Sequence, residues 1–313
     1  MFISGSTALQ FFDRSFYADS DLDIYVEHRY CKPIALWLES IGYSFRPRKT
    51  YQSSSLDIAL EETLSESDFD VNNLPQGFFE SASMGYFGRG VTNVYNFHKI
   101  YPDRKIQLIT SFYAPLEIVL NFHSSKLVLS GSFSLVYITI LACVMNLITH
   151  ERAYSLYPHA TFEERRSLVI STEGSKQETA RKKYTERGWT MVKTGQDEDI
   201  RNAKSDFTSC QRYIGDSRCW TIPILPMLDL PGDSMATNTW ELKYKPIPIV
   251  ELEFEALAEL LANPDVNVKG RVEPVLNFTI LRAENLRFSY LVVDKSVQEF
   301  LTPALLQSSE GGR

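Results

Sequence analysis

Two aspartates separated by one apolar residue, Asp21 and Asp23, constrain the fold of this chain more than any other feature. They lie in a short run in which polar and apolar residues alternate, the pattern of a β-strand with one face in a core. Residues two apart on a strand point to the same face, so the two carboxylates are expected side by side. The opposite face is expected to anchor the strand through Leu22, Ile24 and Val26.

This strand follows a small-residue turn, Gly5-Ser6, and a short helical stretch, Leu9–Phe12. A helix that starts at such a turn aims its N-terminal N–H groups at a phosphate. The paired carboxylates can then hold one or two divalent cations beside that phosphate. Mg²⁺ prefers oxygen ligands and usually binds through one or two carboxylates plus substrate phosphates, and Mn²⁺ can take its place. The alternative is that two surface aspartates merely follow a turn.

The runs Phe2–Phe12 and Ser20–Val26 carry a resemblance to a known family. With a Gly-Ser turn and an Asp-x-Asp strand in this order, the chain resembles the nucleotidyltransferase superfamily, which includes polymerase beta and poly(A) polymerases. It looks most like an uncharacterised fungal branch. The resemblance covers residues 1–125, with a looser echo in the C-terminal half. It implies an α/β (α+β) fold, with a mixed sheet flanked by helices, that binds a nucleoside triphosphate with Mg²⁺.

The resemblance also implies a role for each residue of the motif. Gly5 would let the backbone approach the phosphates and Ser6 would hydrogen-bond them, while Asp21 and Asp23 would hold the metal. A nucleotidyl group would pass to a hydroxyl acceptor by in-line displacement, with metal ions clamping the attacking and leaving oxygens. The sequence does not identify the acceptor. In the family a helix precedes the motif strand, so the true N-terminus is expected upstream of Met1.

The family keeps a third carboxylate on a hairpin, which the runs Val91–Lys99 and Lys105–Thr110 predict here. By register that position is Gln107. A neutral amide offers a carbonyl oxygen to a metal, but it is no base and adds no charge. We therefore expect metal and nucleotide binding to survive better than turnover. Asp57 is a second candidate for the missing carboxylate, although its place before the hairpin favours a position in an insertion.

The length of 313 residues suits about two domains. We expect a core over residues 1–125, with a loop-like acidic insertion at 53–90. A mixed, mainly helical region is expected over 143–304, followed by a disordered tail at 305–313.

Individual elements are predicted from local signals. A helix is expected from Lys32 to Ile41 and a strand from Tyr43 to Tyr51. In the C-terminal half, capping boxes predict helices that start at Thr161 and Ser175. The remaining two predictions are a helix over Pro248–Ala262 and a strand over Leu286–Val293.

The stretch Leu127–Thr149 has no charged residue, and three explanations stay open. A transmembrane helix has sufficient length, but the Ser, Gly and Asn residues within the stretch argue against it, so no membrane partner is expected. A buried core helix fits the composition, with the β-branched residues as a mild objection. In the third explanation residues 126–142 are a translated intron, because their coding length is a multiple of three and the terminal codons can contain splice signals.

The charge balance and the cysteines exclude some function classes. A net charge of −7 and a pI near 5.4 argue against nucleic acid as a general ligand. The basic run Arg181–Lys183 with Arg187 can meet a phosphate chain or RNA, or form a solvated helix face. The four cysteines lack zinc-site spacing and no secretory signal is visible, so an intracellular protein, cytoplasmic or nuclear, is predicted.

Two functions therefore stay open. The first is a nucleotidyltransferase that binds Mg²⁺ and a nucleoside triphosphate and transfers a nucleotidyl group. The second is a catalytically degenerate member, a nucleotide-binding or protein-interaction module in which Asp21 and Asp23 are kept and the chemistry is lost at Gln107.

Overall fold

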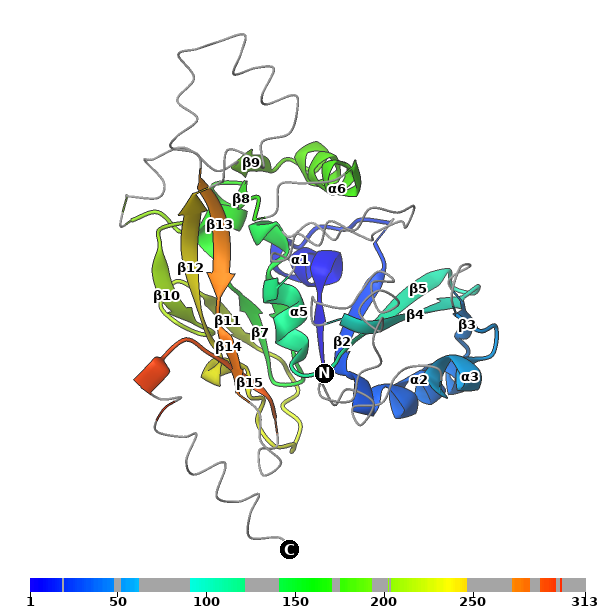
Figure 1. The fold of residues 1–313 in the computed structure, drawn as a ribbon. Coiled ribbons are helices and arrows are strands. Elements are labelled where there is room, and N and C mark those ends of the chain that lie inside the picture. Colours follow the sequence, from blue (N-terminus) through cyan, green and yellow to red (C-terminus); the bar gives the residue numbers. More distant parts are fainter. Residues whose placement is uncertain are drawn as a thin grey trace, which may run out of the picture.

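The chain forms a mixed α/β structure built around one large sheet (Figure 1). The computed structural model describes residues 1–18, 20–47, 52–61, 91–121, 141–170, 175–192, 202, 204–246, 272–281, 288–296 and 299. The predicted helix at 248–262 and the predicted tail at 305–313 lie outside these residues, as do 62–90 of the predicted insertion and 127–140 of the long uncharged stretch.

The large sheet has eight strands in the order β11-β7-β6-β1-β2-β5-β4-β3. Only β2 and β5 are parallel neighbours, and the other neighbouring pairs are antiparallel. The strands are β1 Phe2–Ser4, β2 Leu22–Glu27, β3 Ser44–Arg46, β4 Val91–Lys99, β5 Arg104–Ser111, β6 Asn146–Ile148, β7 Arg152–Ser155 and β11 Trp220–Pro223. Because Ile3 of β1 pairs with Ile148 of β6, the sheet continues across the domain boundary predicted at residue 125.

The N-terminal helices cover this sheet, and local sequence signals account for them. In α2 the buried residues Cys31, Ala35 and Leu38 recur at helical spacing, which gives one apolar face. That face packs against β4 and β5 together with α3 (Figure 1). The predicted hairpin and the predicted helix from Lys32 are confirmed, whereas the strand predicted at 43–51 is limited to β3. The helices are α1 Gly5–Asp13, α2 Cys31–Ser40, α3 Leu56–Glu61 and α5 Pro115–Asn121, with a 3-10 turn η1 at His28–Tyr30.

Strands predominate in the described part of the C-terminal half, so the prediction of a mainly helical region is not confirmed. The physical reason is visible at residues 239–244, where buried Trp240 and Leu242 alternate with Glu241 and Lys243 at the period of a strand. The smaller-sheet strands are β8 Arg166–Leu168, β9 Thr190–Val192, β10 Cys210–Tyr213, β12 Thr239–Pro246, β13 Val272–Asn277, β14 Thr279–Leu281 and β15 Tyr290–Val292.

The two capping boxes in this half predict one helix each, and one of the two predicted helices is not formed. The helix predicted from Ser175 is confirmed as α6, Ser175–Glu186. Thr161 instead lies inside a π-helical turn, η4 His159–Glu163, which ends before Arg165 at a φ of 54°. The strand β8 follows at once and leaves no room for a helix. The 3-10 turns are η3 Ala142–Val144 and η5 Met235–Thr237.

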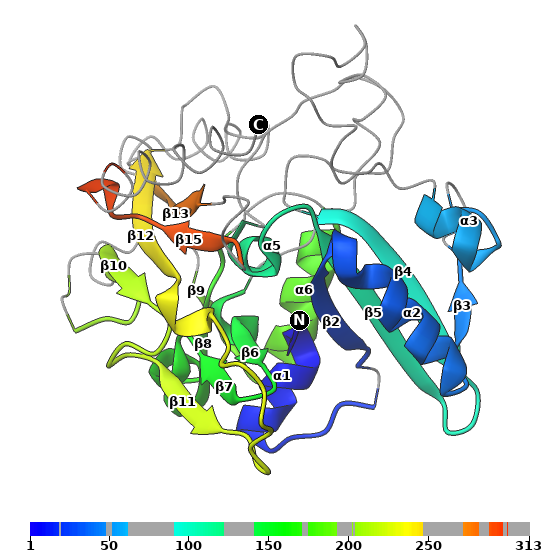
Figure 2. The same ribbon diagram turned by 90° about the horizontal axis from the view of Figure 1, so that it is seen from below.

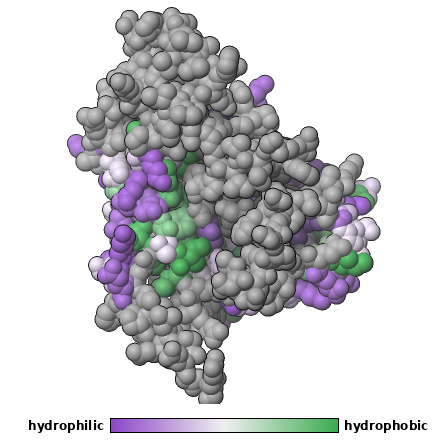
Figure 3. All heavy atoms as spheres, in the orientation of Figure 1, coloured by the Kyte–Doolittle hydropathy of each residue, from purple (hydrophilic) through white to green (hydrophobic). Residues whose placement is uncertain are grey.

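Three hydrophobic clusters connect these elements. The largest lies between the large sheet and the C-terminal strands, and the partly buried Phe278 and Ile280 pack against it. Figure 3 shows hydrophobic residues at the surface in the part of the molecule where Figure 1 draws β13 and β15. The third cluster joins α1 to α6 through Leu9, Tyr184 and Trp189. Among the described helices, none is long and apolar enough to cross a membrane.

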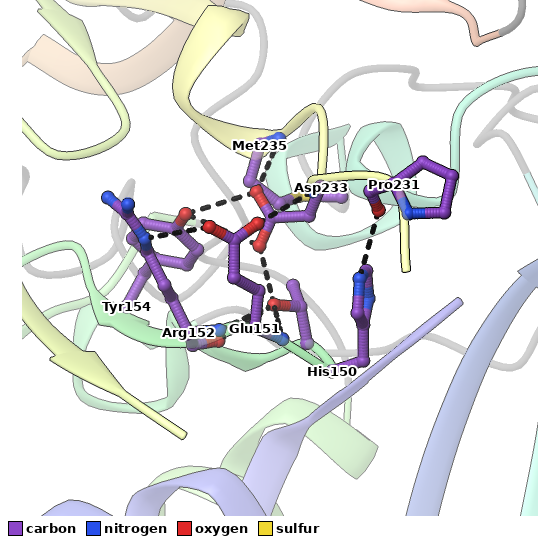
Figure 4. Close-up of polar contacts among 8 residues, drawn as sticks. His150, Glu151, Arg152, Tyr154, Pro231, Asp233 and Met235 are labelled. Atoms are coloured by element: carbon purple, nitrogen blue, oxygen red, sulfur yellow. Dashed lines mark hydrogen bonds and ion pairs between the residues drawn. The ribbon is translucent and has the colours of Figure 1, made fainter. Parts of the chain in front are cut away.

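A polar cluster around Asp233 fastens the segment after β11 to the β6–β7 hairpin (Figure 4). The Asp233 carboxylate accepts hydrogen bonds from the Thr149 hydroxyl at 2.5 Å and the Tyr154 hydroxyl at 3.1 Å. Its own N–H donates to the Glu151 carboxylate at 2.9 Å, and Glu151 also pairs with Arg152 at 3.3 Å. These groups satisfy one another, so the cluster has a structural role.

Removing the central carboxylate should destabilise the fold. Asp233→Ala leaves the buried Tyr154 hydroxyl without its acceptor and removes one of the two acceptors of the Thr149 hydroxyl, which also donates to the carbonyl of Arg152 at 2.9 Å. The free energy of unfolding is therefore expected to fall by about 2 kcal/mol. Urea denaturation measures this change. The matched control is Asp229→Ala in the same segment, whose side chain is exposed and which should change stability by less than about 0.5 kcal/mol. Equal losses in the two variants would contradict this role of Asp233.

Candidate functional site

The turn between β1 and α1 brings the chain unusually close to the strand β2. Gly5 opens α1 with a φ of +71°, a left-handed conformation that favours glycine. A Cβ atom at this position would lie 2.5 Å from Oδ2 of Asp23, closer than any side chain tolerates. The preceding Ser4 is fixed by a hydrogen bond from its hydroxyl to the carbonyl of Asn146 at 2.7 Å. Glycine at position 5 therefore permits both the turn and the approach of the Asp23 carboxylate.

Asp21, which directly precedes β2, and Asp23 on β2 lie beside Gln107 of β5. Asp23 lies opposite Gln107 in the parallel pair of strands, and the Gln107 amide donates a hydrogen bond to Oδ2 of Asp21 at 3.3 Å. The backbone carbonyl of Asp21 accepts a hydrogen bond from the Thr7 hydroxyl at 2.9 Å, which ties this residue to α1. The structure thus brings Gln107 next to the aspartate pair, at the position that the family resemblance implied for a third carboxylate.

The expected core face of β2 is also present. Ile24 and Val26 are buried in the cluster beneath α2, and Leu22 packs against it partly buried. Tyr25, on the same face as Asp23, is buried as well, and its ring stacks on Phe2 with centroids 5.4 Å apart. Both faces of the strand are therefore anchored, which fixes the direction of the carboxylates.

The electrostatics of the pair are unfavourable for two ionised carboxylates. Burial, followed by the neighbouring Asp21 charge, raises the pKa of Asp23 from 3.8 to about 7, and Lys183 opposes the rise. A raised folded-state pKa means that the folded chain holds the proton more tightly than the unfolded chain. The contribution of this group to stability is therefore full below pH 3.8 and is lost as the pH rises to about 7.

Helix α6 contributes two further residues, Lys183, which the sequence placed in a basic run on a solvated face or at a phosphate, and Tyr184, which the sequence analysis did not single out. Tyr184 is buried, and its hydroxyl shares a hydrogen bond of 2.7 Å with the hydroxyl of Ser6. Lys183 lies close enough to Asp23 to lower the pKa of that carboxyl. The one available signal was the aromatic ring of Tyr184 within a highly charged helix, since such a ring needs a buried surface.

The oxygen atoms at this site can act as ligands for a hard cation. Asp21 and Asp23 offer carboxylates, and Gln107 offers an amide oxygen if its side chain turns over. In the part of the chain that the structure describes, no group of three or more His, Cys, Asp and Glu side chains is placed to hold a metal ion. Asp57 is not brought to the pair, because α3 lies beside β3, at the far edge of the sheet from β2 (Figure 1).

Comparison of the chain with protein-family models, curated proteins and solved structures found no match.

The close approach at Gly5 makes a direct prediction about stability. Gly5→Ala combines a left-handed backbone with a clash against Asp23, so we expect a loss of about 2–5 kcal/mol in the free energy of unfolding. Gly188→Ala is the matched control, because Gly188 has a φ of +97° and no atom within 4 Å of the added Cβ. Its loss should be about 1 kcal/mol. Similar losses measured by urea denaturation would contradict the tight contact between Gly5 and Asp23.

Proposed function

We propose that this chain is a nucleotidyltransferase-fold protein that binds a nucleoside triphosphate together with Mg²⁺. The observation that carries the proposal is the close packing of the Asp23 carboxylate against Gly5 at the start of α1, with Asp21 beside it. A nucleotide bound here would have its phosphates at a helix N-terminus and its metal ion on the adjacent carboxylates.

The residues present fit a divalent cation. Asp23 is half-buried beside a second carboxylate, and burial together with the Asp21 charge raises the pKa of Asp23 although Lys183 opposes the rise. A cation between the two carboxylates would favour their ionised forms and remove the repulsion. Mg²⁺, or Mn²⁺ in its place, would be held by Asp21 and Asp23 and would polarise the phosphoryl oxygens of the nucleotide.

The chain's own residues would do the rest of the binding. The N–H groups at the start of the nine-residue helix α1 would donate to phosphate oxygens. The Ser6 hydroxyl is shared with Tyr184, so a phosphate that uses Ser6 would have to share or replace that hydrogen bond. Lys183 would add positive charge on the same side as Asp23.

A second candidate function follows from one contact. The Gln107 amide donates to Asp21 at 3.3 Å, where a third carboxylate would instead add negative charge and a base. This contact favours a protein that binds the nucleotide but transfers slowly or not at all, or one that serves as an interaction module. Nucleotidyl transfer to a hydroxyl acceptor remains the activity proposed for an active form.

Calorimetric titration of Mg²⁺-ATP into the full chain tests the binding proposal. We expect a binding signal that disappears without Mg²⁺ and weakens at least about tenfold in the Asp21→Asn, Asp23→Asn double variant. The control is Asp229→Asn, an exposed aspartate outside the site, which should bind as the unchanged chain does. If a folded sample does not bind, or if the double variant binds equally well, the proposed nucleotide site is wrong.

A second arm of the same experiment separates the two candidate functions. Gln107→Asp restores a carboxylate beside Asp21 and Asp23 and should increase nucleotidyl transfer from labelled ATP if this position limits the chemistry. No increase in a variant that still binds Mg²⁺-ATP would favour the nucleotide-binding or interaction module.

A further inference from the structure

Strand β11 forms one end of the eight-stranded sheet, and among the described strands it pairs with β7 alone. Figure 2 draws β11 at the lower left margin of the molecule, with the segment that follows it along the same margin. An edge strand presents backbone N–H and C=O groups that can pair with another chain. Whether β11 can pair in this way depends on which of its backbone groups face outward and on the side chains around them.

The hydrogen-bond alternation identifies the outward-facing residues. The N–H of Ile224 donates to the carbonyl of Glu151 at 2.9 Å, so these two residues form a hydrogen-bonded pair. Such pairs alternate with non-bonded pairs along antiparallel strands. The register therefore turns the backbone of Ile222 toward β7 and that of Thr221 and Pro223 outward. Because Pro223 has no N–H, Thr221 is the residue of β11 that presents both a donor and an acceptor.

The side chains around this edge are apolar and exposed. Trp220 and Ile222 share a face of the strand and are 38% and 39% exposed. The Trp220 ring stacks on Phe162 with centroids 5.4 Å apart and an interplanar angle of 15°, which holds the indole in place. Large apolar side chains that are 55–75% exposed continue in the next segment at Leu225, Met227, Leu228 and Leu230. A run of exposed apolar residues of this kind marks an interaction surface.

We infer that β11 and residues 224–230 form the surface through which two copies of this chain associate. The charge pattern supports a second copy as the partner. Between Cys219 and Pro231 the only charged residue is Asp229, so two chains that each carry a net charge of −7 can meet here without close repulsion. A two-fold symmetric contact uses the same patch on both chains, which an uncharged apolar surface satisfies.

The geometry of β11 also suits pairing with itself. With the two-fold axis at Thr221, this residue exchanges its N–H and C=O hydrogen bonds with Thr221 of the second copy. Trp220 then lies opposite Ile222 of the second copy on the same face, an aromatic and β-branched pairing that stabilises antiparallel strands. Pro223 ends the ladder, so the two backbone hydrogen bonds set the register and the apolar side chains supply most of the affinity.

Analytical ultracentrifugation of the full chain over a concentration series tests this inference. We expect the mass to rise from 35.8 kDa toward twice that value. Thr221→Pro removes the outward N–H without touching the pairing with β7, and should weaken the dimer at least about tenfold. Thr221→Val keeps the N–H and a branched side chain and should associate as the unchanged chain does. Circular dichroism confirms that each variant is folded.

Ile222→Lys provides a second variant should Thr221→Pro not fold, because it places a charge against the apolar face of the second copy and should weaken association comparably. The inference is overturned if the unchanged chain stays at 35.8 kDa up to about 100 µM, whether or not it captures another protein. It is overturned equally if it dimerises and neither Thr221→Pro nor Ile222→Lys weakens the dimer. Because none of these residues belongs to the aspartate site, failure here leaves the proposed nucleotide binding standing.

Discussion

The contact between the Asp23 carboxylate and the backbone of Gly5 organises the rest of the site. It requires a residue without a Cβ and a left-handed turn at the start of α1, and it brings a buried charge to a helix N-terminus. The hydrogen bond from Thr7 to the Asp21 carbonyl ties the same helix to the second carboxylate. These contacts hold two carboxylates close together with little water around them, which disfavours their ionised forms. A divalent cation between them would favour the ionised forms.

Sequence reasoning located this part of the structure because its signals are local. The period of two residues predicted a strand that carries Asp23, and β2 confirms it. The hairpin pattern predicted the strand of Gln107, while the place of that residue beside the aspartates was implied by the family resemblance. The Gly-Ser turn predicted the start of a short helix, and α1 begins at Gly5. These strand, helix and hairpin predictions used patterns within single short segments or between two neighbouring ones.

The remaining features depend on contacts between distant segments, which no local pattern specifies. Lys183 and Tyr184 reach the site because Trp189 and Leu9 pack α6 against α1. The C-terminal strands are short, and several have only three or four residues, too few to show a clear period. The helix predicted from Thr161 is wrong because a capping-box sequence is also compatible with a single turn. The strand β8 follows this turn and prevents its extension into a helix.

The most direct test of the account is the pKa of the Asp23 carboxyl, measured by carbon NMR on aspartate-labelled protein with Asp23→Asn as the assignment control. The account predicts a titration near pH 7 without metal, because of burial and Asp21, and a shift to lower pH when Mg²⁺ is added. A titration at the ordinary value of 3.8 that Mg²⁺ does not change would contradict it, since the pair would then need no cation.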